Sequence, residues 1–271
     1  MKKFASVALT LAMLLSLCML SSCGKVTAYS LVADAQEKMS KLDSYEMEAD
    51  ITMQLDMGMM GGKAEIPAKI SVKAAGLTSD SPVLLETIEM AGESISVYNE
   101  GEWMYGVVDG VGVKSRVDED FDIIMESYDN VGFMKKPFSE ELMKDVEIVE
   151  DEDGTRSVSV AVPDDMLEEY FDIVLKELMG EGISENEGVD VSMGFTDTVV
   201  DFAIDENGYI SHYDISCNIF VKGTMTESGG VSVSMEIPFD MTCTFVDPGA
   251  AVTVTPPEGY QDFAESGSAS L

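Results

Sequence analysis

The sequence predicts an α+β fold in which a long antiparallel sheet covers a core on one side. Long segments alternate strictly between apolar and polar residues, and short glycine-containing turns separate several of them. Only a few segments show the three- and four-residue spacing of an amphipathic helix. With 271 residues, of which 45% are hydrophobic, the chain can bury a sizeable core. No internal repeat or linker divides it, so we expect one domain over residues 29–257 and a polar tail over residues 258–271.

The first 22 residues are predicted to be a lipoprotein signal peptide. Two lysines precede an apolar stretch from Val7 to Leu20, which is too short for a stable membrane span. The following Leu-Ser-Ser-Cys matches the lipobox of bacterial lipoproteins, which implies cleavage before Cys23 and lipidation of its thiol. An ordinary secretory signal is the alternative. Residues 23–28 form a short tether, so the domain is expected within ~20 Å of the membrane.

The charge of the chain excludes one class of partner. Sixteen Lys and Arg stand against 51 Asp and Glu, a formal net charge of −35. Such a surface repels phosphate backbones, so we expect no nucleic-acid partner. It also repels anionic lipid head groups, so acyl chains at Cys23 would have to provide the membrane anchor. The acidic runs lack the pattern of a calcium loop, and we expect no metal site.

Alternation predicts the first two strands as a hairpin. Between Glu46 and Met57 the odd-numbered residues are apolar and the even-numbered residues are polar. Residues 58–62 form a turn, and the alternation returns from Ala64 to Val72. Pro67 lies on the polar side, which indicates an edge position or a bulge.

The other elements are predicted from the same two patterns, the two-residue alternation of strands and the three- to four-residue spacing of helices. Helical spacing predicts helices over residues 29–42, 118–130 and 163–178, and Ser139 caps the start of a short one. Alternation predicts further strands over residues 84–90, 95–98, 103–108, 146–149, 158–162, 189–204, 209–222 and 231–246.

Two cysteines lie on the apolar faces of the last two predicted strands. If these strands pair as a hairpin that turns at residues 229–231, facing residue numbers sum to 460, and Cys217 lies opposite Cys243. Outside the cytoplasm, two facing cysteines would form a disulfide. A slip of two residues would separate them, and two free buried thiols are the alternative.

No motif in the sequence indicates catalysis. The segment Gly110-Val-Gly-Val-Lys-Ser115 lacks the glycine that precedes the lysine of a phosphate-binding loop. The only histidine, His212, falls on the polar face of its strand, where a solvated side chain is expected. We therefore predict no enzyme, no catalytic residues and no cofactor. A hydrolase with two close carboxylates remains open as the weakest alternative, because 51 acids include many chance neighbours.

Methionine is the unusual component of the composition. The chain contains 20 methionines, and many fall on the apolar faces of predicted strands. Flexible thioether side chains suit a deformable surface that accepts varied acyl chains, although methionine also fills gaps in ordinary cores. The candidate residues for a ligand groove are Met53, Leu55, Met57, Ile70, Met90 and Met241.

Two segments resemble a known group of proteins. The helix-to-strand step from Ala33 to Met53 (ADAQEKMSKLDSYEMEADITM) and the hairpin from Ile95 to Tyr105 (ISVYNEGEWMY) are similar to Gram-positive lipoproteins of the LolA/LprG-like superfamily, which includes the DUF6612 family. The resemblance implies a strongly curved antiparallel sheet, an open half-barrel with helices packed on its concave face. Relatives of that fold carry lipoproteins or glycolipids, and others act as envelope sensors.

These observations lead to one functional hypothesis and one alternative. We expect a non-enzymatic lipoprotein, anchored on the outer side of the membrane of a Gram-positive cell, that binds or carries a lipid or another hydrophobic ligand in the half-barrel. The alternative is a structural, protein-binding or sensor module of the cell envelope with a packed interior.

Overall fold

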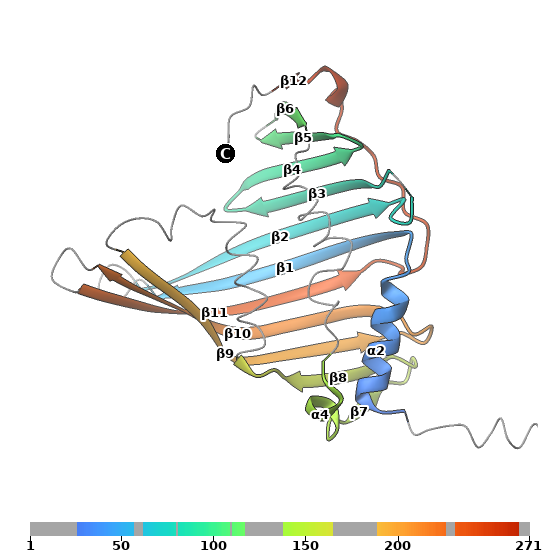
Figure 1. Cartoon of the computed structure of the whole chain (residues 1–271), viewed down its shortest axis with the longest axis vertical. Helices are drawn as coiled ribbons and strands as arrows, with labels where there is room; N and C mark the ends of the chain where they lie inside the picture. Colours follow the sequence, from blue (N-terminus) through green and yellow to red (C-terminus); the bar gives the residue numbers. More distant parts are fainter. Residues whose placement is uncertain are drawn as a thin grey trace, which may run out of the picture.

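One open sheet dominates the structure, a computed structural model (Figure 1). Its twelve strands lie in the order β12-β6-β5-β4-β3-β2-β1-β11-β10-β9-β8-β7, and neighbours are antiparallel except for the parallel pair β12 and β6. The strands at the two ends of this order, β12 and β7, are not neighbours, so the sheet is open. The structure describes residues 26–56, 62–79, 81–108, 110–116, 138–164, 189–225 and 231–265.

Most strands lie where alternation predicts them. Their bounds are β1 Ser44–Asp56, β2 Lys63–Ala75, β3 Val83–Met90, β4 Glu93–Glu100, β5 Trp103–Val108, β6 Val111–Arg116, β7 Ile148–Glu150, β8 Arg156–Ala161, β9 Val189–Ile204, β10 Ile210–Met225, β11 Val231–Phe245 and β12 Ala264–Glu265. Pro67 of β2 lies one residue beyond the last β2–β3 pair, Ala68 with Met90, which agrees with the predicted edge position. The sequence did not predict β6, which contains residues 111–115 of the rejected phosphate-loop segment.

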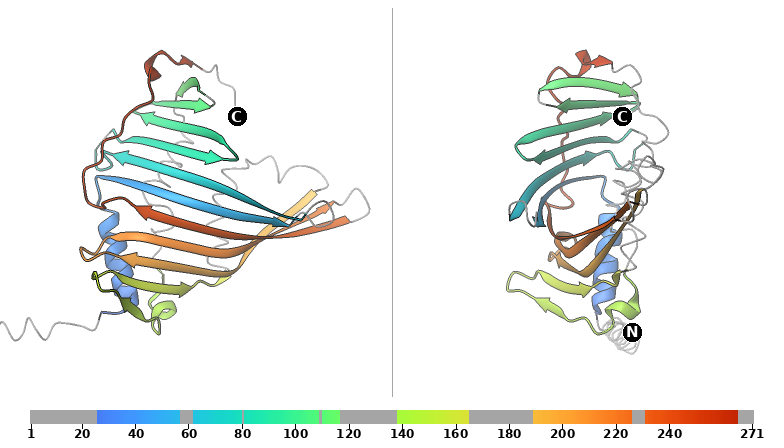
Figure 2. Two further views of the ribbon diagram at one scale, coloured as in Figure 1. Left: turned by 180° about the vertical axis from the view of Figure 1, so that it is seen from behind. Right: turned by 90° about the vertical axis from the view of Figure 1, so that its left-hand side faces the viewer.

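Helix α2 (Ala28–Met39) packs against one face of the sheet, over β9 and β10 (Figure 2). It begins at Thr27, whose hydroxyl accepts a hydrogen bond from the backbone N–H of Ser30 in a capping box. Its buried stripe includes Leu31, Val32 and Met39. The short helix α4 (Glu140–Met143) lies beside it and is capped by Ser139, as predicted.

The structure does not describe two of the predicted helices. The first, predicted over residues 118–130, lies outside the described residues. The second, predicted over residues 163–178, is described only as far as Asp164. The signal segment and Cys23 also lie outside the described residues. Within the described ranges, no helix combines the length and the apolar character that a membrane crossing requires.

The predicted register of β10 and β11 is wrong. The two strands pair from Met225 with Val231 to His212 with Thr244, so facing residue numbers sum to 456 instead of 460. Strand β10 runs to Met225, further than expected, and β11 begins at Val231. Cys217 therefore faces Phe239, and Cys243 faces Tyr213.

This register contradicts the predicted disulfide. Cys217 and Cys243 are both free and buried. Four residues along a strand span roughly 13 Å, whereas a disulfide needs Cα atoms within roughly 7 Å. Because the error in the sum is even, both thiols still lie on the apolar face.

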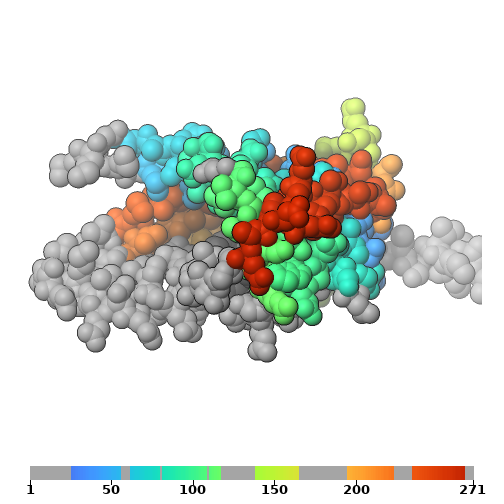
Figure 3. Space-filling view, turned by 90° about the horizontal axis from the view of Figure 1, so that it is seen from above, coloured from blue at the N-terminus to red at the C-terminus, as the bar shows by residue number. Residues whose placement is uncertain are grey.

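Residues 258–265 of the predicted polar tail pack against the sheet, and residues 266–271 lie outside the described residues. The 3-10 helix η4 (Tyr260–Asp262) places the Tyr260 ring 4.9 Å from that of Tyr105, and β12 follows against β6. Phe263 covers Gly112, where an added Cβ would lie 2.4 Å from the phenyl ring. Seen from above, these residues (red) lie across the strands β4–β6 (green) (Figure 3).

Candidate ligand-binding face

A single line of apolar residues crosses eleven of the twelve strands, and we call it the apolar row. Each member is paired with the next in the sheet register. From one end of the sheet to the other, the row is Ile148, Val158, Phe202, Tyr213, Cys243, Ala49, Ile70, Ile88, Ile95, Val108 and Val111.

Burial along the apolar row falls from one end of the sheet to the other. Val158 and Phe202 are 1% exposed, and they belong to the core cluster that includes α2 and Phe138. Toward β6, Ile95 is 41% exposed, Val108 46% and Val111 66%. The row therefore begins as the core of the protein and ends as an accessible apolar surface.

Neighbouring positions widen this surface. Val113 is paired with Gly106, and Met90 with Ala68, on the same side of the sheet as the row. Single exposed apolar side chains are ordinary, but a contiguous patch of them marks an interaction or ligand site. We call this patch the exposed apolar face; its members are Met90, Ile95, Val108, Val111 and Val113.

The predicted groove residues are only partly brought together. The register places Met53, Leu55, Ile70, Met90 and Met241 on the same side of the sheet, whereas Met57 lies outside the described residues. Of these residues only Met90 belongs to the exposed apolar face; the other four are half-buried. Sequence reasoning did not single out Ile95, Val108, Val111 and Val113, although the alternation of Val111 and Val113 in β6 is a signal for two of them.

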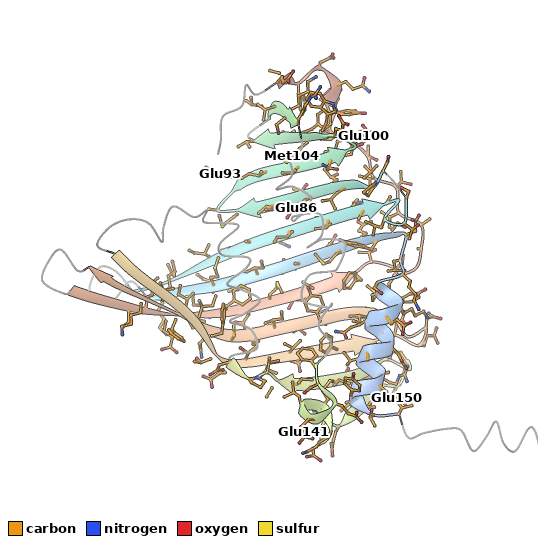
Figure 4. The ribbon with its side chains drawn as sticks, viewed as in Figure 1. Glu86, Glu93, Glu100, Met104, Glu141 and Glu150 are labelled. Atoms are coloured by element: carbon orange, nitrogen blue, oxygen red, sulfur yellow. The ribbon has the colours of Figure 1, made fainter. Side chains whose placement is uncertain are left out.

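Polar groups interrupt this apolar side at a few positions. Glu86 is paired between Val72 and Val97, and Glu93 is paired with Met90. Figure 4 labels both glutamates on adjacent strands. Asn99 of β4, paired with Leu84, is 3% exposed. The exposed apolar face thus lies beside acidic and amide groups.

The opposite side of β1, β2, β10 and β11 is polar. Lys69 Nζ lies 3.0 Å from Asp50 Oδ1 in a solvent-exposed ion pair. His212 is on this side, as predicted, with Nε2 2.8 Å from Asp214 Oδ2. In the described part of the chain, no three His, Cys, Asp or Glu side chains cluster closely enough to hold a metal ion.

The two buried cysteines are held as protonated thiols. Burial, with a smaller contribution from Asp240, raises the pKa of Cys217 from 9.0 to about 11. Burial likewise raises the pKa of Cys243 to about 11, and Tyr213 opposes that change through a hydrogen bond. Thiolates are the reactive form of cysteine, so neither thiol is suited to nucleophilic chemistry at neutral pH.

We expect alkylation of both thiols to be slow while the protein is folded. A rise in pKa from 9.0 to about 11 lowers the thiolate fraction at pH 8 about 100-fold. Mass spectrometry after iodoacetamide treatment at pH 8 should show both thiols unmodified in buffer and both modified in 6 M urea. A product resistant to alkylation in urea until reductant is added would instead reveal the disulfide.

Comparisons with known proteins give a distant structural similarity. No protein-family model matches the chain, and neither does any curated protein sequence. The fold is similar to a LolA superfamily protein from Nitrosomonas europaea, with 10% identity and a TM-score of 0.25 over 82% of this chain and 92% of that one. It is also similar to a DUF1329 family protein from Desulfovibrio piger, with 10% identity and a TM-score of 0.23 over 81% and 90% of the two chains. Similarities at these TM-scores assign no function to the chain.

Proposed function

We propose that this chain is a non-enzymatic lipoprotein of the cell envelope that binds a lipid or another hydrophobic ligand on the apolar side of its open sheet. One observation carries the proposal: the apolar row continues past the core and ends in Ile95, Val108 and Val111, which are 41–66% exposed. A monomeric protein gains nothing in stability from apolar side chains in water, whereas a ligand with acyl chains would cover them.

The arrangement of the ligand site and its place in the cell are part of the same proposal. Helices packed on the concave face of the sheet, as the resemblance to LolA/LprG-like lipoproteins implies, would border the ligand. Lipidation of Cys23 would hold the domain outside the cytoplasm and close to the membrane, where lipids are available. The lipobox and the resemblance of residues 33–53 to LolA/LprG-like lipoproteins support this location.

Native mass spectrometry tests the proposal directly. A chain that begins at Gly24 would be purified without detergent from a lipid-containing host. We expect an adduct of lipid mass that organic solvent releases. A bare mass from several hosts, together with a protein partner in stoichiometric amount, would favour the alternative of a protein-binding module with a packed interior.

Two matched variants test whether the exposed apolar face is the binding surface. Val111 is 66% exposed on this face, and Val149 is 58% exposed on the opposite side of β7, paired with Ser157. Val111→Asp places a carboxylate where the ligand would exclude water, so the affinity for the uncharged dye Nile red should fall at least about tenfold.

The control variant Val149→Asp should bind Nile red like the unmodified chain. Because both side chains are exposed, neither variant should change the urea midpoint of unfolding noticeably. If the two variants bound Nile red with equal affinity, the exposed apolar face would not be the binding surface.

A further inference from the structure

Two carboxylates lie on the apolar side of strands β1–β6 (Figure 4). Glu86 of β3 is half-buried and is paired with Val72 and Val97, and Glu93 of β4 is exposed and is paired with Met90. Glu93 makes no ion pair with a described lysine or arginine. A carboxylate beside an apolar surface costs little in water, but it loses hydration when a ligand covers that surface. The charge of Glu93 is therefore part of what a ligand of the exposed apolar face meets.

The cations of these strands all lie on the opposite side of the sheet. Strands β1–β6 contain Lys63, Lys69, Lys73, Lys114 and Arg116. Each is an odd number of residues from Ile70 or Val111 of the apolar row, and successive residues of a strand alternate between faces. Arg156 is on the apolar side, but it belongs to β8, seven strands from β4 in the sheet order and toward the buried end of the apolar row. Within β1–β6, the apolar side thus carries acidic side chains and no basic ones.

Glu93 borders the exposed apolar face in two directions. Across the hairpin it is paired with Met90, which is 48% exposed, and the Cβ atoms of directly paired residues on one face lie roughly 5 Å apart. Along β4, Ile95 follows on the same face after roughly 7 Å. From Ile95 the apolar row continues to Val108 and Val111, across roughly 10 Å of sheet. A ligand that covers these residues therefore ends at the Glu93 carboxylate or crosses it.

The carboxylate restricts the chemical group that can be placed at this end. An alkyl chain over Glu93 would remove its hydration without compensation, and a phosphate or a second carboxylate would be repelled. An ammonium group would instead form an ion pair at the border of the apolar surface, where partial exclusion of water by the alkyl chain strengthens the attraction. The net charge of −35 favours a cation in the same way over longer distances.

We propose that the exposed apolar face selects a cationic amphiphile, a ligand with an alkyl chain and an ammonium group, and that Glu93 pairs with the ammonium group. This inference rests on the proposed function and adds the class of ligand to it. The alkyl chain lies along Ile95, Val108 and Val111, and the ammonium group lies beside Met90 at the end of the β3–β4 hairpin.

Displacement of Nile red by two matched amphiphiles tests the selection. Dodecylamine and dodecanoate have the same number of carbon atoms and carry opposite charges at pH 7. Both would be used below the concentration at which they form micelles, with the chain from Gly24 to Leu271, which keeps every described residue. At about 0.15 M salt, which screens the distant charges of the chain, dodecylamine should displace the dye at a concentration at least about tenfold lower than dodecanoate.

Glutamine variants separate a local ion pair from the overall charge of the chain. Glu93→Gln should weaken dodecylamine binding about fivefold, and Glu89→Gln should leave it unchanged. Glu89 is the matched control because it is exposed at the same end of the same hairpin, paired with Ser94, but lies on the opposite side of the sheet. The charge-reversed variant Glu93→Lys should remove the preference for dodecylamine over dodecanoate. None of the three exposed substitutions should change the urea midpoint of unfolding noticeably.

The outcomes distinguish this inference from the proposed function. Equal displacement by the two amphiphiles, or displacement by neither although Nile red binds, overturns the selection of a cation and leaves a general hydrophobic site. An unchanged affinity of Glu93→Gln for dodecylamine, or an equal loss in Glu89→Gln, overturns it in the same way. Failure of Nile red itself to bind removes both proposals.

Discussion

Removal of residues 258–271 is expected to lower the free energy of unfolding by about 3 kcal/mol. The ring of Tyr260 packs edge-on against Tyr98 and Tyr105 at centroid distances of 5.3 and 4.9 Å, and Phe263 packs against Tyr105 at 6.4 Å. Three such contacts at about 1 kcal/mol each give this value. Urea unfolding monitored by circular dichroism measures the change, and truncation after Glu265 is the control because it removes none of these rings.

A tyrosine titration provides an independent readout of the same contacts. Burial, with the nearby Glu100 carboxylate, raises the pKa of Tyr98 to about 12. Since this pKa is raised in the folded state, the stabilisation it represents is present below the ordinary pKa of 10.0 and is lost as the pH rises toward 12. Truncation after residue 257 should bring Tyr98 back toward its ordinary titration range in ultraviolet absorbance. An unchanged titration would show that the C-terminal segment does not shield this ring.

A pair of glycine variants locates the effect at Phe263. A Cβ added at Gly112 would lie 2.4 Å from the Phe263 ring, whereas one added at Gly106 would lie 3.6 Å from its nearest neighbour, a methyl group of Val113. Gly112→Ala should therefore reproduce part of the loss caused by truncation, and Gly106→Ala should not. Equal stabilities of the two variants would contradict the packing of Phe263 on β6.

The sequence was enough to predict which face of the sheet each side chain occupies. It was not enough to predict the register, that is, which residues of neighbouring strands are paired. Alternation assigned Met47 and Val72, or Cys217 and Cys243, to the apolar side, because a side chain's face depends only on whether its position is odd or even. The β10–β11 register has the same property, so sums of 456 and 460 both keep the apolar residues together. The residues at which β10 ends and β11 begins decide between them, and the pairing of Met225 with Val231 places Cys217 opposite Phe239.

Long-range packing explains what the sequence did not reveal about the candidate site. Val158 and Val111 are the same residue type in the same apolar row, yet one is 1% exposed and the other 66%. The difference arises from α2 and Phe138, which pack at one end of the row. Tyr260 and Phe263 lie among polar residues that show neither the strand nor the helix period. Their contacts with Tyr105 and Gly112 therefore could not be predicted from the sequence and are visible only in the structure.

Phe202→Ala is expected to cost about 4 kcal/mol of stability. Phe202 is 1% exposed in the apolar row, and its ring packs edge-on against Phe138 at 5.5 Å. Its truncation leaves a cavity under α2 in addition to the lost burial of the ring. The measurement is the free energy of unfolding from urea titrations.

Val111→Ala, at the other end of the same row, tests the gradient in burial. With 66% of the residue already exposed, its truncation should change the free energy of unfolding by less than about 0.5 kcal/mol. A loss above about 1 kcal/mol would mean that this end of the apolar row belongs to the stabilising core. Its apolar side chains would then not be available to a ligand, which would contradict the proposed binding surface. A negligible loss in the same variant, combined with weakened Nile red binding, would instead assign these valines to ligand binding.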